Sequence, residues 1–234
     1  MSKIDELIKK HCPDGVEYKM LGDCLLRNVG GGTPSKSKAA YWGGDIPWAS
    51  VKDIVKYKQT LEETIDHITE KGLQSSNSNI IPKGEIIVAT RIVPGKMVIA
   101  GKNIAINQDL RGLFLKETVL NKFLVYYFQT ICVSGQGTTV KGVKINDLLK
   151  VTIPIPPLPV QSAIASILDK FTELEAELEA ELEAELEARR KQYEHYRNEL
   201  LSFDTHIAGA FAQNRPLIPD PIPALCRACN DKEA

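Results

Sequence analysis

The sequence lacks the apolar segments that would place the protein in a membrane or export it. Of its 234 residues, 43% are hydrophobic, which is ordinary for a soluble protein. No apolar run reaches the roughly 20 residues that a membrane-spanning helix needs. Residues 1–10 carry charges throughout and contain no apolar core of signal-peptide length. These absences predict a cytoplasmic protein without a membrane partner.

Cysteine is scarce. There are five cysteines, an odd number scattered along the chain, which suits a reducing compartment better than a disulfide framework. Cys226 and Cys229 form a C-x-x-C pair, but without a second pair this spacing is weak evidence for zinc. The four histidines, at positions 11, 67, 195 and 206, lack metal-ligand spacing. We expect no metal site.

Recognisable catalytic motifs are absent as well. The sequence contains no Walker loop, no H-E-x-x-H helix, no nucleophile elbow and no dinucleotide fingerprint after a strand. It also lacks the Asn/Asp-Pro-Pro-aromatic motif of amino-methyltransferases. The glycine-rich stretch at residues 30–38 does not end in the G-K-[ST] of a nucleotide loop, and a plain surface loop is the alternative. We expect no catalytic residues, so a binding or assembly role is favoured over catalysis.

The most regular stretch is Glu173–Ala188, in which Glu-Leu-Glu-Ala occurs four times in succession. Every residue in it favours a helix, and neither Gly nor Pro interrupts it. Apolar residues spaced three and four apart continue on both sides, which predicts a long helix from near Gln161 to Phe203. Its apolar face is a candidate dimer interface that comprises Phe171, Leu174, Leu178, Leu182, Leu186 and Tyr193.

Charge along this helix predicts how two copies would pair. The repeats contain eight Glu, and Arg189, Arg190 and Lys191 follow directly. A parallel pair would set Glu against Glu, whereas an antiparallel pair places the acidic half of each helix against the basic end of the other. We expect an antiparallel coiled coil in a two-fold homodimer. The alternative is a solvated single helix that acts as a spacer.

The residues before the helix have a different composition. Residues 1–155 contain 21 Lys and Arg against 15 Asp and Glu, while residues 156–234 contain 8 against 15. An anionic partner would therefore meet the first part of the chain. Trp48 is predicted to lie in the core, as are Phe123, Tyr127 and Phe128 of a helix. Hydrophobic spacing predicts helices at 4–11, 62–73, 121–133 and 146–149, and strands at 16–20, 97–100, 104–106 and 151–155. Residues 80–90 read as a turn and a buried strand, and residues 107–109 as a polar turn.

These patterns divide the chain into three parts. Residues 1–155 read as a mixed α/β (α+β) domain with short elements. A stiff proline-rich linker at 153–159 leads into the long helix, which is assigned to residues 156–207. Residues 208–234 contain four closely spaced prolines, from Pro216 to Pro223, and are predicted to be a disordered tail.

Four features resemble the specificity subunits of Type I restriction–modification systems. Gly31–Ser35 followed by Tyr41–Ser50 is similar to the start of a target recognition domain, and Cys12–Tyr18 to the opening of the family. Ile153–Gln161 resembles the junction at which a recognition domain runs into a conserved helix, and tetrapeptide repeats in that helix are a further family feature. Together these features cover residues 4–203.

The resemblance implies a function. Such subunits are non-catalytic and carry two recognition domains, each of which reads one half of a split DNA site. Two antiparallel helices join the domains and dock DNA methyltransferase subunits, and a restriction subunit joins some complexes. S-adenosylmethionine, ATP and Mg would belong to those partner subunits. This chain has one recognition domain and one helix, so it resembles a half-length subunit that pairs with itself or with another half.

Candidate DNA contacts follow from side-chain chemistry, because recognition domains differ where they read bases. Phosphate contacts are predicted for five lysines: Lys36, Lys38, Lys96, Lys141 and Lys144. Side chains with paired hydrogen-bonding groups are candidate base readers: Asn77, Arg91, Gln108, Arg111 and Gln136. The alternative for each is solvated surface, or a structural polar contact for Gln108 and its neighbour Asn107.

Two other functions fit the sequence. One is a stand-alone dimeric DNA-binding regulator, which sequence-specific binding without any methyltransferase would favour. The other is a coiled-coil scaffold without a nucleic acid partner, which absence of DNA binding even beside a methyltransferase would favour. The bases read and the identity of the second half do not follow from the sequence.

Overall fold

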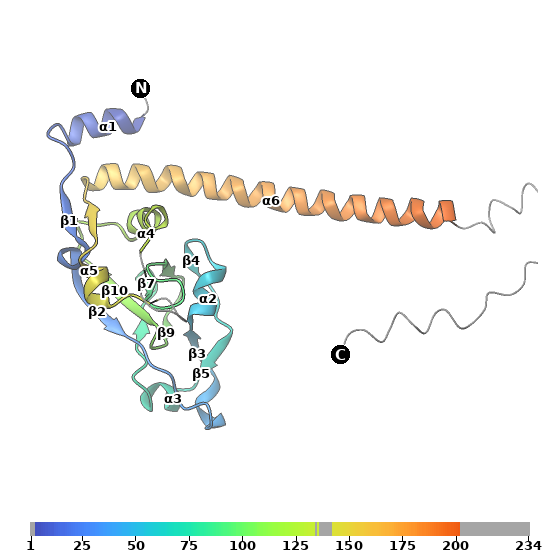
Figure 1. The fold of residues 1–234 in the computed structure, drawn as a ribbon, viewed down its shortest axis with the longest axis horizontal. Coiled ribbons are helices and arrows are strands. Elements are labelled where there is room, and N and C mark those ends of the chain that lie inside the picture. The colour runs from blue at the N-terminus through green and yellow to red at the C-terminus, as the bar shows by residue number, and fades with distance from the viewer. Residues whose placement is uncertain (1–2, 134, 136–141, 202–234) are drawn as a thin grey trace, which may run out of the picture. The chain divides into compact units, whose positions relative to one another are not determined.

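The computed structural model, shown in Figure 1, describes residues 3–133, 135 and 142–201. The chain divides into two compact units, Met1–Glu173 and Leu174–Ala234. Helix α6 (Leu158–Leu201) contributes residues to both units. The predicted fold class, a mixed α/β domain followed by a long helix, is confirmed.

A five-stranded sheet forms the centre of the first unit. Its strand order is β2-β10-β7-β8-β4, and all neighbours are antiparallel except β4 and β8. Successive side chains alternate between faces, so Ile86 and Val88 pack in one core cluster and Ile87 and Ala89 in another. The sheet is therefore covered on both faces. Its strands are β2 (Leu25–Gly30), β4 (Thr60–Leu61), β7 (Ile86–Ala89), β8 (Met97–Ala100) and β10 (Leu110–Leu115).

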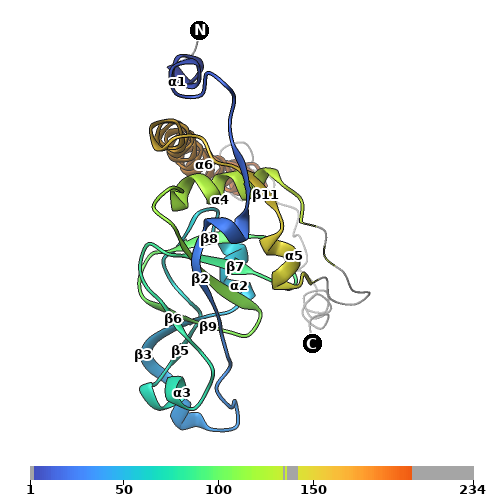
Figure 2. The same ribbon diagram turned by 90° about the vertical axis from the view of Figure 1, so that its left-hand side faces the viewer.

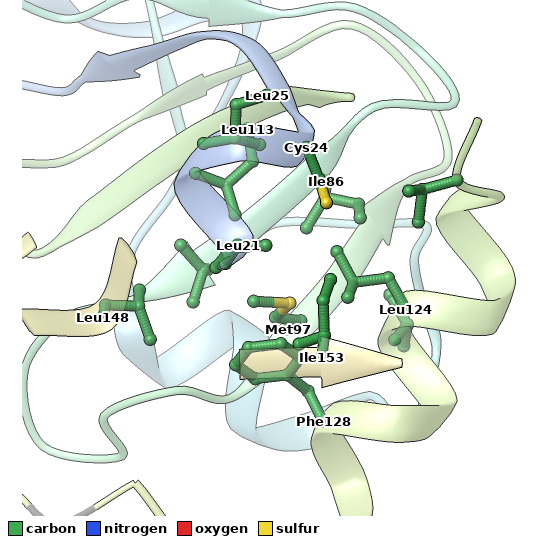
Figure 3. Packing of buried hydrophobic residues seen from close by; sticks show 13 residues of the cluster. Leu21, Cys24, Leu25, Ile86, Met97, Leu113, Leu124, Phe128, Leu148 and Ile153 are labelled. Carbon is green, nitrogen blue, oxygen red and sulfur yellow. The ribbon is translucent and has the colours of Figure 1, made fainter. Parts of the chain in front are cut away.

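Helix α4 closes the first of these clusters. Figure 3 shows Leu124 and Phe128 of this helix in the same cluster as Ile86 and Leu113 of the sheet. Leu148, from a short helix later in the chain, completes the cluster on another side. The elements that supply this cover are the 3₁₀ helix η1 (Leu21–Cys24), α4 (Asn121–Thr130) and α5 (Ile145–Leu149).

A four-stranded sheet of order β5-β3-β9-β6 forms the opposite end of the unit from α4, as Figures 1 and 2 show. Trp48 on β3 is only 4% exposed, which confirms its predicted place in the core. Its indole nitrogen donates to the carbonyl of Gly32 at 3.1 Å, and the ring of Trp42 packs edge-on at 5.1 Å. The strands are β3 (Trp42–Ala49), β5 (Asp66–Ile68), β6 (Ile80–Ile81) and β9 (Ile104–Ile106).

A short strand pair joins the beginning of the domain to its end. Strand β1 (Tyr18–Met20) runs antiparallel to β11 (Thr152–Pro154). Tyr18 lies opposite Pro154 in this pairing. Helix α1 (Lys3–His11) precedes the pair in the chain, and α6 follows it.

The buried side chain of Gln161 ties the start of α6 to the domain. Its amide oxygen accepts from the backbone N–H of Leu120 at 2.8 Å. Its amide nitrogen donates to the carbonyls of Thr118 at 2.9 Å and Pro156 at 2.7 Å. Helix α6 begins at Leu158, three residues before the predicted start. The side chain that fixes the helix therefore lies in its first turn.

A second polar contact lies two turns further along α6. The carboxylate of Asp169 accepts from Lys122 Nζ at 2.8 Å and from the hydroxyl of Tyr126 at 3.0 Å. Burial raises the pKa of Tyr126, so the hydroxyl stays protonated and able to donate at neutral pH. The first turns of α6 are thus packed against α4.

One predicted helix is wrong. Residues 62–73 form strand β5 and then a separate short helix, α3 (Glu70–Gln74). Ile68 is fully buried and pairs with β3, while Thr69 caps α3 by accepting from the N–H of Gly72 at 3.1 Å. A strand and a helix placed end to end produced apolar spacing that resembled one helix.

The other predicted elements agree with the structure to within a few residues, and β8 and β9 agree in full. On α4, Phe123 and Phe128 are buried as predicted, but Tyr126 takes the buried position expected of Tyr127, which is half-buried. Seven other elements were not predicted from the sequence: η1, β2, β3, β4, β10, the short helix α2 (Val51–Lys56) and the 3₁₀ helix η2 (Ala39–Tyr41).

The second unit is helical throughout its described part, from Leu174 to Leu201. Exposed ion pairs link successive turns, with Lys191 2.6 Å from Glu187 and Arg189 3.5 Å from Glu185. The predicted helix end at Phe203, the tail at 208–234 and its C-x-x-C pair lie outside the described residues. Among the described helices, none combines the length and the apolar character that crossing a membrane requires.

Candidate nucleic-acid interface

Two glycines allow three chain segments to approach one another closely. A Cβ atom added to Gly31 would overlap the carbonyl oxygens of Ile106 and Asn107, and one added to Gly32 would lie 2.7 Å from the carbonyl carbon of Asn77. The N–H of Gly32 donates to the carbonyl of Ile106 at 3.0 Å. The glycine-rich loop, the loop before β6 and the turn after β9 therefore lie side by side.

Polar side chains fasten these segments together. Asn79 donates to the carbonyl of Gly30 at 2.9 Å, and the hydroxyl of Ser78 donates to the carbonyl of Ile106 at 2.8 Å. The hydroxyl of Thr33 donates to the amide oxygen of Gln108. Gln108 is exposed, so its side chain lies where the glycine-rich loop meets the turn after β9.

The turn between β9 and β10 is built from its own side chains. Asn107 is buried, and its side-chain oxygen accepts from the N–H of Asp109 at 3.0 Å. The carbonyl of Asp109 accepts from both the N–H and the hydroxyl of Thr90, each at 2.8 Å. These bonds join the start of β10 to the end of β7. Asn107 thus has the structural contact that was one of its two expected roles.

Arg91 follows Thr90 and extends toward solvent. Its Nη1 lies 3.5 Å from Oδ1 of Asp109, and the Arg91 side chain is 65% exposed while that of Asp109 is 17% exposed. On the other side of the turn, Arg111 donates to the side-chain oxygen of Asn28 on β2 at 3.0 Å. These adjoining segments carry six residues that we call the polar edge: Thr33, Asn77, Arg91, Gln108, Asp109 and Arg111.

The polar edge contains four of the five predicted base readers. Asn77, Arg91, Gln108 and Arg111 come from separate segments that the close packing at Gly31 and Gly32 and the pairing of β7 with β10 bring together. The fifth, Gln136, lies outside the described residues. Three edge partners were not predicted as functional: Asn28, Thr33 and Asp109. Asp109 was visible only as part of a polar turn, and nothing in the sequence pointed to Asn28.

The predicted phosphate-binding lysines are more widely spread. Lys144 is exposed and lies close to the polar edge, because its neighbour Val143 donates to the carbonyl of Thr90 at 2.8 Å. Lys36 and Lys38 are exposed on the loop that continues from Thr33. Lys141 lies outside the described residues.

Two of the lysines have partners within the domain. Lys38 donates to the hydroxyl of Tyr41 at 3.2 Å, and this bond is the main cause of a lowered pKa for Tyr41. Lys96 is half-buried and donates to the carbonyl of Val55, at the end of α2, at 3.2 Å. The ammonium of Lys96 is therefore engaged by α2.

The apolar stripe of α6 is the second candidate surface. All six residues predicted for the dimer interface are 53–66% exposed in the single chain. In the same described residues, no group of three or more His, Cys, Asp or Glu is placed to hold a metal ion. The described residues thus offer two candidate surfaces, the polar edge on the domain and the exposed apolar stripe on the helix.

Comparison with known proteins identifies a family whose members are similar to this chain. A family model described as the Type I restriction modification DNA specificity domain matches residues 13–188. The chain is 32% identical over 201 residues to the EcoR124I/EcoR124II specificity subunit of Escherichia coli, covering 80% of this chain and 48% of that protein. It is 36% identical over 207 residues to the EcoprrI specificity subunit of Escherichia coli, covering 81% and 51%. The chain thus spans about half the length of the relatives it matches.

Solved structures agree at the level of the fold. A chain in a structure of the type I R-M system matches with a TM-score of 0.62 and 22% identity, over 82% of this chain and 48% of that one. The HsdS subunit from Thermoanaerobacter tengcongensis matches with a TM-score of 0.54 and 19% identity, over 75% and 44%. The resemblance seen in the sequence is confirmed: the chain belongs to the family of Type I restriction–modification specificity subunits.

Proposed function

We propose that this chain reads one half of a bipartite DNA site through its polar edge. The observation that carries the proposal is the gathering of Asn77, Arg91, Gln108 and Arg111 on one border of the domain. Arg pairs with guanine through two adjacent donors, while Asn and Gln pair with adenine through one donor and one acceptor. These four side chains therefore supply both kinds of base recognition from one surface.

Exposed lysines beside the polar edge would fix the domain on the duplex. Lys36, Lys38 and Lys144 are exposed on the segments that lead into or out of it. Phosphate contacts position a protein without reading sequence, and they make binding depend on salt. Base selection would thus come from the polar edge and orientation from the lysines.

A second copy would supply the other half of the site. The relatives in the comparison are about twice as long as this chain, and the apolar stripe of α6 is exposed over several turns. Burying a leucine stabilises an assembly by about 1.5–3 kcal/mol, so the stripe provides a strong reason for helix pairing. The acidic repeats and the basic segment after them favour an antiparallel pair.

The dimer would act as the specificity subunit of a larger complex. DNA methyltransferase subunits would dock on the paired helices, and a restriction subunit would join in systems that cleave DNA. Methylation and cleavage would be carried out by those subunits, which would also bind S-adenosylmethionine, ATP and Mg. This chain would contribute recognition and spacing only.

Methylation mapping tests the proposal directly. The full chain is co-expressed with the methyltransferase subunit of the same genome in a host without other methylation, and modified bases are mapped across the genome. A two-fold homodimer imposes its symmetry on the site, so the expected motif is an inverted repeat interrupted by unread bases. Methylation without any motif would contradict a role in specificity, and a motif with two unrelated halves would contradict the homodimer.

A further inference from the structure

We propose that Asp109 is a positioning residue that holds Arg91 and Gln108 as a preformed base-reading pair. The role of Asp109 rests on the proposed function, since it requires the polar edge to meet DNA. In this role, the carboxylate of Asp109 sets the orientation of Arg91 and Gln108, and the orientation decides which bases the two side chains accept. The DNA sequence selected would be a purine-rich step, because Arg favours guanine and Gln favours adenine.

The two carboxylate oxygens of Asp109 are divided between the two readers. Oδ1 lies 3.5 Å from Nη1 of Arg91, and Oδ2 accepts from Nε2 of Gln108 at 3.3 Å. The amide oxygen of Gln108 is held from the opposite side by the hydroxyl of Thr33. The distances from the carboxylate to Arg91 and to Gln108 are both long for hydrogen bonds. The two side chains are therefore oriented but can still adjust their positions when they meet a base.

Asp109 is itself fixed to the sheet beneath the readers. Its backbone carbonyl accepts two bonds from Thr90 at 2.8 Å, and its N–H donates to the buried side chain of Asn107 at 3.0 Å. The Asp109 side chain is 17% exposed, against 65% for Arg91. A half-buried anchor beside an exposed reader is an arrangement that preorganises a binding site, because little ordering is left to occur on binding.

The backbone beside Arg91 is also constrained. Ile92 has φ = 68°, a left-handed conformation that is costly for a β-branched residue. The carbonyl of Arg91 accepts from the N–H of Val93 at 2.8 Å, and Arg91 forms an isolated bridge with Gly142. Such strain persists where surrounding contacts impose it. The guanidinium of Arg91 thus projects from a fixed backbone toward a fixed carboxylate.

Electrostatics gives this role a signature that a structural role would not have. A carboxylate on a DNA-facing border repels phosphates, so Asp109 weakens binding to any sequence. Orientation of the readers, by contrast, strengthens binding to one sequence relative to the others. Removal of the charge should therefore lower discrimination between sequences without weakening binding to DNA in general.

The test compares Asp109→Asn with the unaltered chain, each assembled with the methyltransferase subunit. Binding is measured to the mapped site, to duplexes altered one base pair at a time, and to an unrelated duplex. We expect discrimination to fall at one or two adjacent positions, by up to the roughly 5- to 150-fold that one bidentate base contact provides. Binding to the unrelated duplex should be unchanged or tighter. Asp14→Asn, an exposed acid in the turn before β1, removes the same charge and should preserve discrimination.

A second variant separates positioning from folding. In an Arg91→Ala background, Asp109→Asn should cause little further loss at the position that Arg91 reads, because the group it orients is gone. Additive losses there, or equal weakening on every duplex with a lower melting temperature, would overturn the positioning role. An unaltered complex without sequence preference would refute the proposed function itself. A selective complex whose preference survives Asp109→Asn would refute only the role of Asp109.

Discussion

At the scale of single residues, Gly31 determines whether the polar edge can assemble. A Cβ there would overlap two carbonyl oxygens, so Gly31→Ala must push the loop away from the turn after β9. Overpacking of this kind costs about 1–3 kcal/mol, and we expect a loss of that size in denaturant unfolding. Gly30→Ala is the control, because its added Cβ would meet only the end of the Arg111 side chain, at 3.4 Å. Equal free energies of unfolding for the two variants would show that the loop can move to accommodate the added Cβ without a cost in stability.

Arg91 carries the sharpest prediction about base selection. If it reads a guanine with paired donors, Arg91→Ala should cost about 1–3 kcal/mol on the preferred duplex. The cost should be much smaller on duplexes that already lack that guanine, so the mapped motif should become degenerate at one position. Binding of the variant to a panel of single-base changes provides the measurement. An equal loss of affinity on every duplex would mean instead that Arg91 contacts a phosphate or stabilises the fold.

At the scale of elements, the lysines near the polar edge should govern salt dependence. Removing one phosphate contact flattens the slope of log affinity against log salt by roughly 0.9, so Lys36→Gln and Lys144→Gln should each do so. Titration of binding to an unrelated duplex at several salt concentrations measures the slope. Lys38→Gln and Lys96→Gln are the informative comparisons, because each ammonium already donates within the domain, to Tyr41 and to Val55. We expect a smaller change for these two variants. Unchanged slopes for Lys36→Gln and Lys144→Gln would mean that DNA binds to another surface.

The length of α6 yields a prediction about spacing. One Glu-Leu-Glu-Ala unit adds about 6 Å of helix and about 40° of rotation, which is close to the roughly 34–36° of one base-pair step. Deleting Glu181–Ala184 should therefore shorten the unread spacer by about one or two base pairs and leave the recognised bases unchanged. Methylation mapping of the deletion variant checks both points. A spacer of unaltered length would mean that the repeats do not set the distance between domains.

Two of the strands missed from the sequence, β3 and β10, share one physical cause. Strand β3 contains Gly43, Gly44 and Pro47, and β10 contains Gly112, residues that ordinarily indicate turns. Here Gly44 packs against the backbone of β5, and a Cβ on Gly112 would overlap Ile81. These glycines serve close approach between segments that are distant in sequence. Only the folded chain shows such neighbours, whereas β8, β9 and α4 could be predicted from local spacing.

The same limit applies to the candidate site. The chemistry of Arg91, Gln108 and Arg111 could be predicted from residue type, but their gathering on one edge depends on strand pairing that no local pattern encodes. Lys96 has the same chemistry as Lys144, yet its bond to Val55 separates the two. Asp109 was not predicted because an acid is an unexpected member of a surface proposed to meet DNA.

At the scale of the whole molecule, pairing through α6 is the central prediction. Replacing Leu178 and Leu182 with Asp places charges in the middle of the apolar stripe, where burial of a charge is strongly unfavourable. The variant should sediment as a monomer at concentrations at which the unaltered chain is a dimer. Glu177→Gln with Glu183→Gln, changed in the same repeats, should remain dimeric. A dimer that survives the leucine substitutions would have its interface elsewhere.

The pairing of β1 with β11 has a consequence for how such a chain can change. Tyr18 and Pro154 are opposite one another, so the polypeptide enters and leaves the recognition domain at neighbouring points. A module whose entry and exit are adjacent can be excised and replaced without stretching what flanks it. New DNA preferences would then be acquired by transplanting residues 18–154 as a block between chains, while the helix and its pairing surface stay as they are.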